Sequence, residues 1–348
     1  MFCYTTNMYD RLHTAMVVLG FAAWLGACAP TVIPAGPSVI APRANEASLV
    51  MQDGVELALH RWIPEGQPRA LVLALHGFNE TGNSFELPGV AWAKEGVALY
   101  AYDQRGFGAS PQRGIWPGTD SLVADLETAT NLIAARHPGL PLHVLGESMG
   151  GAVVMVASAH GKLRQTEGAI LVAPAVRGRE TLNVFARAGL WFFAHTVPWL
   201  AGYPRNTGIT PTDNKEALRA LSRDPLVIKD TRIDAVWGLV NLMDDALAAA
   251  PALDRQVLIL LGAHDDLVPD EPTDLMLRRL PPASPGARRM AEYRNGYHML
   301  LRDLQADVVY RDVVAWIGSR RSDPTLPLPS GAERSLPPPA PTETAARD

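Results

Sequence analysis

Two patterns of apolar positions alternate along the central part of the chain. Short, continuous apolar runs are typical of buried parallel strands, whereas apolar positions that recur every three or four residues indicate helices. The predicted strands are 48–52 and 55–62, which flank the hairpin signal Asp53-Gly54, and 70–75, 97–102, 142–145, 169–172, 257–261 and 289–293; the predicted helices are 85–95, 121–136, 149–160 and 303–317. This order predicts an α/β fold with a mostly parallel central sheet and helices on both faces.

A long helical insertion, at about 175–253, separates two of these strands. Ligands of open parallel sheets bind outside the carboxyl ends of the strands, and the insertion leaves the sheet at that edge. Its aromatic cluster consists of Trp191, Phe192, Phe193 and Trp199. We therefore expect a helical cap over the site, whose aromatic residues either line a substrate entry or pack within the cap.

The first residues have the pattern of an export signal. Arg11 precedes a 13-residue apolar run, Ala15–Ala27. A membrane-spanning helix needs about 20 apolar residues, but the core of a signal peptide needs only roughly 7–15. We therefore predict that residues 1–27 are a signal peptide, with an N-terminal anchor helix as the alternative.

The end of this run, Leu25-Gly26-Ala27-Cys28, resembles a bacterial lipobox. The resemblance implies that Cys28 is lipidated and becomes the mature N-terminus of a membrane-anchored lipoprotein in the cell envelope. Ala29 stands where an aspartate retains lipoproteins at the inner membrane. The resemblance thus implies the periplasmic face of the outer membrane, and an unlipidated signal peptide is the alternative.

The segments on either side of the strand–helix pattern differ from it in composition. Residues 28–45 are rich in Pro, Ala and Gly, which is typical of a flexible tether. Residues 323–348 are rich in Pro and poor in apolar residues that fill a core, which predicts a disordered tail. We therefore expect the folded domain to cover residues 46–322.

Charge and cysteine content exclude several classes of protein. The chain carries 31 basic and 36 acidic residues, a net charge of −5, so nothing favours nucleic-acid binding. No Cys–His spacing typical of zinc sites is present, and no metal is expected. Both cysteines, Cys3 and Cys28, precede the predicted domain, so an intramolecular disulfide is not expected within it. No feature indicates a required protein partner.

Gly146-Glu147-Ser148-Met149-Gly150 lies where a predicted strand changes into a predicted helix. This G-x-S-x-G motif in that context is the nucleophile elbow of α/β-hydrolases, with the serine on a strained turn. Small residues are needed because strand and helix approach closely. We predict that Ser148 is a catalytic nucleophile; a purely structural turn is the alternative.

A serine hydroxyl needs a base, and the base needs an orienting acid. His298 follows the last predicted strand in a loop that opens a helix, and Asp265 and Asp266 follow the strand before it. Either aspartate suits the role of the acid. The order Ser148, acid, His298 matches that of α/β-hydrolase triads.

Two backbone N–H groups are candidates for an oxyanion hole, which must be in place before the charge forms. Met149 directly follows the nucleophile, and Phe78 lies in His76-Gly77-Phe78 after the first buried strand. We expect His76 itself to be a buried, hydrogen-bonded residue, since His298 fills the role of the base.

The chain resembles the monoacylglycerol lipase and lysophospholipase branch of the α/β-hydrolases, also called the serine aminopeptidase group, over about residues 46–320. The motifs that carry the resemblance are His76-Gly77-Phe78, DQRGFGAS at 103–110, GESMGG at 146–151, GAHD at 262–265 and GYH at 296–298. It implies an α/β-hydrolase fold, Asp265 rather than Asp266 as the acid, and hydrolysis of single-chain lipid esters without a cofactor. Thr81-Gly82 replace the His-Ser pair of the family's H-G-x-x-x-H-S loop.

Two other functions fit the same sequence. An aminopeptidase of the proline iminopeptidase type needs an acidic recess for a free amine, which Asp244-Asp245 of the cap could supply. A non-catalytic lipoprotein that only binds lipid is the second. A haloalkane dehalogenase is disfavoured, because it needs Asp in place of Ser148.

Overall fold

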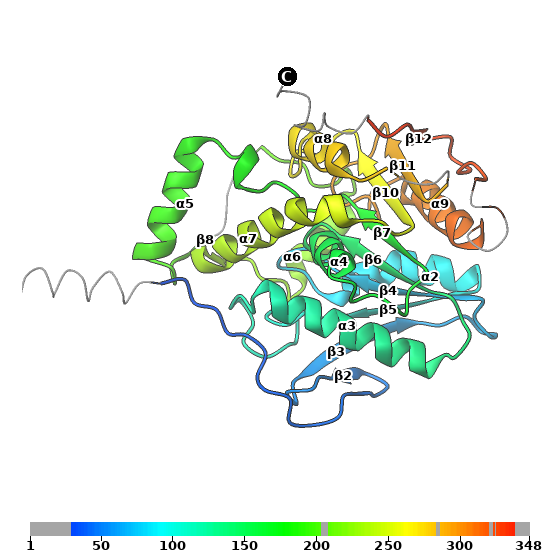
Figure 1. The fold of residues 1–348 in the computed structure, drawn as a ribbon, viewed down its shortest axis with the longest axis horizontal. Coiled ribbons are helices and arrows are strands. Elements are labelled where there is room, and N and C mark those ends of the chain that lie inside the picture. The colour runs from blue at the N-terminus through cyan, green and yellow to red at the C-terminus, as the bar shows by residue number, and fades with distance from the viewer. Residues whose placement is uncertain (1–28, 203–207, 283–285, 320–322, 324, 338–348) are drawn as a thin grey trace, which may run out of the picture.

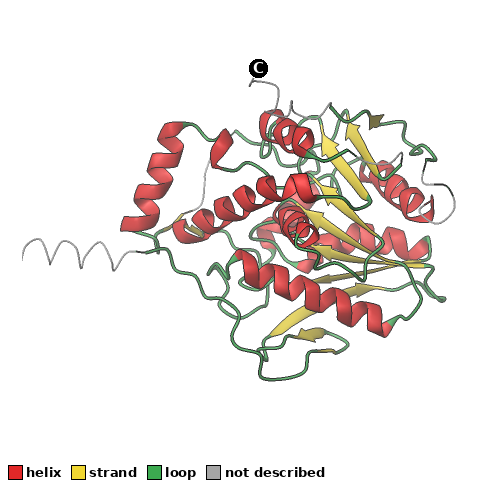
Figure 2. Ribbon diagram, in the orientation of Figure 1, coloured by secondary structure: helices red, strands yellow, loops and turns green. Residues whose placement is uncertain are grey.

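A ten-stranded sheet forms the centre of the molecule (Figure 1 and Figure 2). The computed structural model describes residues 29–202, 208–282, 286–319, 323 and 325–337. In spatial order the strands are β1 (Arg43–Ala44), β2 (Ser48–Val50), β3 (Glu56–Trp62), β5 (Val97–Tyr102), β4 (Ala70–Leu75), β6 (Leu142–Glu147), β7 (Gly168–Val172), β10 (Val257–Gly262), β11 (Arg288–Tyr293) and β12 (Glu333–Arg334). From β5 to β11 all neighbours are parallel, and antiparallel strands flank them on both sides.

Helices cover both faces of the sheet. Every residue of β4 is buried, with Leu71, Leu73 and Leu75 on one face and Val72 and Ala74 on the other. The first face packs against α3 (Thr119–Arg136), α4 (Met149–Ala159) and α7 (Ile233–Ala249), and the second against α2 (Glu86–Lys94) and α9 (Ala306–Ser319). Double-sided burial explains why the central strands are continuous apolar runs.

The observed architecture confirms the predicted mostly parallel sheet with helices on both faces. The segment predicted to form the cap lies between β7 and β10 and is mostly helical. Its elements are α5 (Val184–Thr196), β8 (Ala201–Gly202), α6 (Lys215–Arg223), β9 (Thr231–Arg232) and α7. A further helix, α8 (Asp270–Arg279), connects β10 to β11.

The N-terminal segment differs from the expected flexible tether. Its residues from Ala29 onward are extended, but they lie along the domain and are fixed by hydrogen bonds. The Ile33 N–H donates to the Trp116 carbonyl at 3.0 Å, and the Ala35 N–H donates to Ser121 Oγ at 2.8 Å. Polar groups of the domain surface thus fix a segment whose composition alone indicated flexibility.

Part of the predicted disordered tail is also ordered. Residues 325–337 pack against the domain, and β12 adds an antiparallel strand to β11. Leu328 is only 3% exposed, and the Arg289 guanidinium binds both carboxylate oxygens of Glu333. The prediction was wrong for this stretch. Amino-acid composition does not reveal that one buried leucine and one ion pair are enough to fix a short segment on the domain.

Within the described ranges, none of the helices combines the length and the apolar character required to cross a bilayer. The predicted signal peptide, residues 1–27, and Cys28 lie outside the described residues.

Candidate active site

Ser148 occupies a strained turn between β6 and α4. Its φ of 52° and ψ of −115° are rare for a residue with a side chain. Glycine is required on both sides: a Cβ at Gly146 would collide with the carbonyl of Gly150, and one at Gly150 with the carbonyl of Leu75. The sequence therefore folds locally into the expected elbow, because only glycine allows strand and helix to approach this closely.

His298 and Asp265 meet beside the carboxyl edge of the sheet. His298 Nδ1 lies 2.8 Å from Asp265 Oδ2, while Asp265 Oδ1 accepts the N–H groups of Leu267 and Val268, each at 2.9 Å. A ring that donates from Nδ1 keeps Nε2 as an acceptor in its neutral form. The structure thus places Asp265, rather than Asp266, at the candidate base.

The environment of His298 favours its protonated form. Burial opposes the positive charge, but the hydrogen bond and the charge of Asp265 outweigh this effect and raise the pKa of His298 above its usual value. The side chains of both residues are only 8% exposed. A shielded imidazole with an oriented carboxylate can accept a proton and stabilise the resulting imidazolium.

The loop that follows β4 also lies close to Ser148. A Cβ built on Gly77 would lie 3.5 Å from the Cβ of Ser148, so Phe78, the next residue, is adjacent to the candidate nucleophile. Met149 is the first residue of α4, and N–H groups in the first turn of a helix have no partner within it. Both proposed oxyanion donors therefore lie beside Ser148, and their role remains a prediction.

His76 is a buried structural residue, as expected from the sequence. Its Nε2 accepts the Gln104 N–H at 3.0 Å, so Nδ1 donates to the Gly77 carbonyl at 2.8 Å. Burial lowers the pKa of His76. A neutral ring with both nitrogens occupied fixes the loop that carries Phe78.

The sequence analysis missed a buried charged cluster under the elbow. Arg302 Nη2 lies 2.9 Å from Glu80 Oε2 and 2.9 Å from Glu147 Oε2. The side chains of Arg302 and Glu147 are 8% and 2% exposed. Arg302 therefore links the loop after β4, through Glu80, to Glu147, the residue before Ser148, and itself lies in the loop after His298.

One cation in this cluster faces two carboxylates, and the two titrate differently. Burial opposes ionisation of Glu80, but the charge and hydrogen bonds of Arg302 outweigh it and lower the pKa of Glu80. Burial instead raises the pKa of Glu147 to about 7, despite the charge of Arg302. The spacing along the chain offered no signal for this cluster, because three distant charged residues look like ordinary surface positions.

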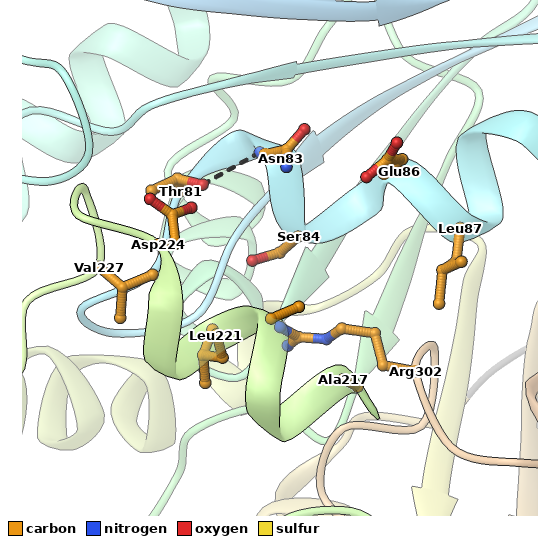
Figure 3. A pocket seen from close by; sticks show the side chains of 11 residues that line it. Thr81, Asn83, Ser84, Glu86, Leu87, Ala217, Leu221, Asp224, Val227 and Arg302 are labelled. Atoms are coloured by element: carbon orange, nitrogen blue, oxygen red, sulfur yellow. Dashed lines mark hydrogen bonds between the residues drawn. The ribbon is translucent and has the colours of Figure 1, made fainter. Parts of the chain in front are cut away.

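A pocket of about 210 Å³ opens on the far side of Arg302, between the segment that follows Thr81 and helix α6 (Figure 3). Asn83, Ser84, Leu221 and Arg302 contribute to its described lining, which includes neither Ser148 nor His298. The pocket is therefore separate from the candidate catalytic residues. Among the described residues, no group of three or more His, Cys, Asp or Glu side chains is placed to hold a metal ion.

The aromatic residues of the cap are half exposed. Trp191 and Trp199 are each 56% exposed, Phe192 is 53% and Phe193 is 48% exposed. Trp191 stacks on His195 with ring centroids 4.8 Å apart, and Phe192 contacts Phe193 edge-on. Their predicted contact with an acyl chain is neither supported nor contradicted by these distances and stays a prediction.

Comparison with known proteins defines the family. The model of the family described as serine aminopeptidase, S33, matches residues 66–305. The chain belongs to this family. Family membership agrees with the motifs of the elbow and of the loops that carry Asp265 and His298, all of which fall within the matched range.

Relatives in the family extend over most of the chain. A monoacylglycerol lipase of Mycolicibacterium smegmatis is 26% identical over 293 residues, which are 81% of this chain and 99% of the relative. A monoglyceride lipase of Rattus norvegicus is 26% identical and covers 80% of this chain and 92% of its own length.

Solved structures agree on the fold. A monoacylglycerol lipase from Paleococcus ferrophilus, 22% identical, superposes with a TM-score of 0.60 over 76% of this chain and 99% of its own. A soluble variant of monoglyceride lipase from Saccharomyces cerevisiae is 19% identical. It superposes with a TM-score of 0.65 over 84% of this chain and 98% of its own. The fold is that of the α/β-hydrolases.

Proposed function

We propose that this protein is a serine hydrolase that cleaves carboxylic esters of single-chain lipids, a monoacylglycerol or a lysophospholipid. The hydrogen bond between Asp265 and His298, together with the strained elbow that carries Ser148, is the observation that carries the proposal. The names of its relatives, monoacylglycerol lipase and monoglyceride lipase, support the substrate class.

The proposed mechanism has two acyl transfers. His298 removes the proton of Ser148, whose Oγ attacks the ester carbonyl, while the N–H groups of Phe78 and Met149 stabilise the oxyanion. His298 then protonates the departing alcohol. Water, activated by the same imidazole, releases the fatty acid and restores the serine. No cofactor is needed in this scheme.

Substitution of the nucleophile and the base tests the mechanism. Ser148→Ala and His298→Ala should each lower kcat on a short p-nitrophenyl ester by about 10⁴-fold or more. Ser222→Ala and His264→Ala change exposed residues of the same types and should leave the rate near that of the wild type. Unchanged esterase activity in Ser148→Ala would refute the mechanism and leave a non-catalytic lipid-binding role.

The aminopeptidase alternative is weakened by the partners of the acidic pair in the cap. Asp244 forms an ion pair with Arg179 and also accepts the backbone N–H of Arg179 at 2.6 Å. Asp245 accepts the Thr119 hydroxyl at 3.1 Å. These contacts occupy the carboxylates that a substrate amine would need. Assays of a monoacylglycerol, a lysophospholipid and an amino-acid anilide separate the two functions, since faster anilide turnover would favour the peptidase.

We further propose that Cys28 carries the lipid that anchors the exported protein to the cell envelope, at the periplasmic face of the outer membrane. The lipobox-like sequence and Ala29 support this proposal. Labelled palmitate should enter the wild type and not Cys28→Ala. A wild-type protein that takes up no label would contradict it.

A further inference from the structure

A single buried guanidinium connects three loops beside the candidate catalytic residues. Nη2 of Arg302 lies 3.0 and 2.9 Å from the two carboxylate oxygens of Glu80, and 2.9 Å from Glu147 Oε2. Glu147 directly precedes Ser148 on the elbow, and Arg302 itself lies four residues after His298. One side chain thus joins the turn of the nucleophile, the loop of the base and the loop that follows β4.

Glu80 holds the middle of the loop that follows β4. It lies two residues after Phe78, and its own N–H donates to the Gly77 carbonyl at 3.3 Å. Its Oε2 also accepts the hydroxyl of Ser84 at 2.9 Å. The carboxylate therefore contacts the later part of the loop, while its bond to Arg302 sets the distance between the loop and the elbow. The position of the Phe78 N–H relative to the elbow depends on that distance.

The loop of the base is tied to Arg302 by its own backbone. The Arg302 N–H donates to the Met299 carbonyl at 2.8 Å, and Asp303 Oδ2 accepts the Tyr297 N–H at 2.8 Å. These two bonds bracket His298 in a short turn. A displacement of the arginine would therefore also displace the imidazole.

Water is largely excluded from this cluster. The side chains of Arg302, Glu80 and Glu147 are 8%, 12% and 2% exposed. Charges attract more strongly in such surroundings, but burying them costs hydration energy, so a buried ion pair is a weak source of net stability. Charged hydrogen bonds do impose defined distances and angles on their partners. The cluster is therefore suited to fix the relative positions of the loops.

We propose that Arg302 is a positioning residue of the ester hydrolysis. Through its two glutamates it fixes the distance between the Phe78 N–H and Ser148. The inference rests on the proposed function. Oxyanion donors stabilise the transition state only where the charge forms, and a misplacement of about 1 Å can cost about 10²-fold in rate. Arg302 acts through Glu80 and Glu147 rather than on the ester itself.

The charge of Glu147 also reaches the base. Burial opposes the positive charge of His298, but Asp265 and, after it, Glu147 raise the pKa of His298. Oε1 of Glu147 has no hydrogen-bond partner among the residues that the structure describes, and burial raises the pKa of Glu147 to about 7. The titratable and charged groups that face this carboxylate are Arg302, Glu80, His298, Asp303 and Tyr310. The two groups therefore influence each other's titration.

Two variants of Arg302 test the positioning on a short, water-soluble p-nitrophenyl ester. Arg302→Met should lower both kcat and kcat/KM of the folded protein by about 10²-fold, because the oxyanion donor is displaced. Arg302→Lys keeps the positive charge and should recover about tenfold of that loss. Near-UV circular dichroism gives the folded fraction of each sample. An Arg302→Met protein with the rate of the wild type would overturn the proposal.

Arg289→Met is the matched control. Arg289 is also a buried arginine in an ion pair, with Glu333, but it lies near the start of β11, away from the carboxyl edge of the sheet. Its loss should lower stability and leave kcat of the folded protein near that of the wild type. Equal losses of kcat in Arg289→Met and Arg302→Met would show general destabilisation and would overturn the positioning.

A boronic acid reports the oxyanion hole separately from turnover. Ser148 Oγ adds to the trigonal boron, and the tetrahedral adduct carries an oxygen where the oxyanion of the ester forms. The Ki of phenylboronic acid should therefore rise in Arg302→Met by about the factor by which kcat/KM falls. An unchanged Ki beside a lowered kcat/KM would contradict the proposal.

Glu147→Gln removes a charge and keeps the shape of the side chain, so the fold should persist even if Arg302→Met does not fold. An amide binds Arg302 less strongly, and the plateau of kcat/KM should fall several-fold. The charge that helps to raise the pKa of His298 is also lost, so the acid limb of the profile should move to lower pH, by less than in Asp265→Asn. A purely structural Glu147 would leave the limb in place, and an unmoved limb with a wild-type plateau would overturn the proposal.

The wild type separates this inference from the proposed function. If the wild type hydrolyses the ester and Arg302→Met keeps its rate, the positioning role alone is wrong. If the folded wild type hydrolyses no ester, the proposed function is wrong, and the positioning role falls with it.

Discussion

Helices α4 and α5 have similar lengths and apolar sequences, but opposite surroundings. In α4, of 11 residues, every position from Met149 to Ser158 is buried, whereas α5, of 13 residues, buries only Ala194. The sheet, α3 and α7 enclose α4, and α5 leaves most of its surface uncovered. An apolar helix sequence thus predicts that other apolar groups cover the helix. It does not show whether those groups belong to the same protein.

The difference separates a closely packed part of the molecule from a part whose apolar surface is uncovered. The elbow region, which carries Ser148, His298 and Asp265, lies among fully packed strands and a buried charged cluster. Helix α5 of the cap leaves most of its apolar residues exposed. Substitutions in the elbow region should therefore have large effects on catalysis and stability, and substitutions on α5 should have small effects on both.

The largest effect is expected from Asp265→Asn. The change removes the carboxylate that orients His298 and stabilises its imidazolium, so kcat should fall by about 10⁴-fold. Loss of this charge also removes the interaction that raises the pKa of His298, and the acid limb of the pH profile should move to lower pH. In the wild type the limb should lie at a higher pH than the usual pKa of a histidine, because the base acts only when neutral.

The pH profile of kcat/KM on a soluble ester measures both effects. The neighbouring Asp266→Asn serves as the control and should retain the wild-type profile. An acid limb that does not move in Asp265→Asn would show that this aspartate does not set the pKa of the base.

Arg302→Met should be the next largest change. It leaves Glu80 and Glu147 buried without their cation, which costs about 3–5 kcal/mol in the free energy of unfolding. Chemical denaturation measures the loss. Arg311→Met removes an exposed ion pair with Asp307 and should cost no more than about 1 kcal/mol. Similar losses in the two variants would mean that the buried cluster does not stabilise the elbow region.

The same glycine substitution distinguishes the two helices directly. In α4, Gly150→Ala would drive a Cβ into the Leu75 carbonyl and should destabilise the fold by about 3 kcal/mol. In α5, a Cβ on Gly189 meets no atom within 4 Å, so Gly189→Ala should stabilise it by about 0.5–1 kcal/mol through helix propensity. Thermal unfolding of both variants gives the signs. A destabilised Gly189→Ala would mean that other atoms pack closely around Gly189, so that α5 is not the uncovered helix that its contrast with α4 indicates.

The smallest effect should come from the aromatic residues of the cap. The double variant Trp191→Ala/Phe193→Ala should lower kcat/KM on a long-chain monoacylglycerol by about tenfold. A decrease of this size corresponds to the loss of a small area of apolar contact between the cap and the acyl chain. The acetate ester should be almost unaffected, because its acyl group is too short to reach the cap. Equal losses on both esters would exclude a role in acyl-chain binding.

Sequence reasoning succeeded where burial on both faces leaves a continuous apolar run. The strands 70–75 and 97–102 were predicted with the bounds that β4 and β5 have in the structure. The loop that carries Asp265 was also located from the sequence, because it follows the apolar run 257–261. The loop that carries His298 follows the strand predicted at 289–293, which is β11 in the structure.

Contacts between distant charged residues were not predictable in this way. Nothing in the local pattern indicates that Glu80, Glu147 and Arg302 converge, since their meeting depends on the path of three separate loops. The exposure of α5 was equally hidden, because its apolar residues resemble those of a core helix.

The short strand β12 has a practical consequence for handling the protein. An open edge strand offers free N–H and C=O groups to other chains and promotes aggregation. Here β12 occupies part of that edge at Met290 and Ala291, and its own brevity and charged side chains discourage further pairing. A chain shortened at residue 322, where composition alone would end the domain, would uncover β11 and should be more prone to self-association.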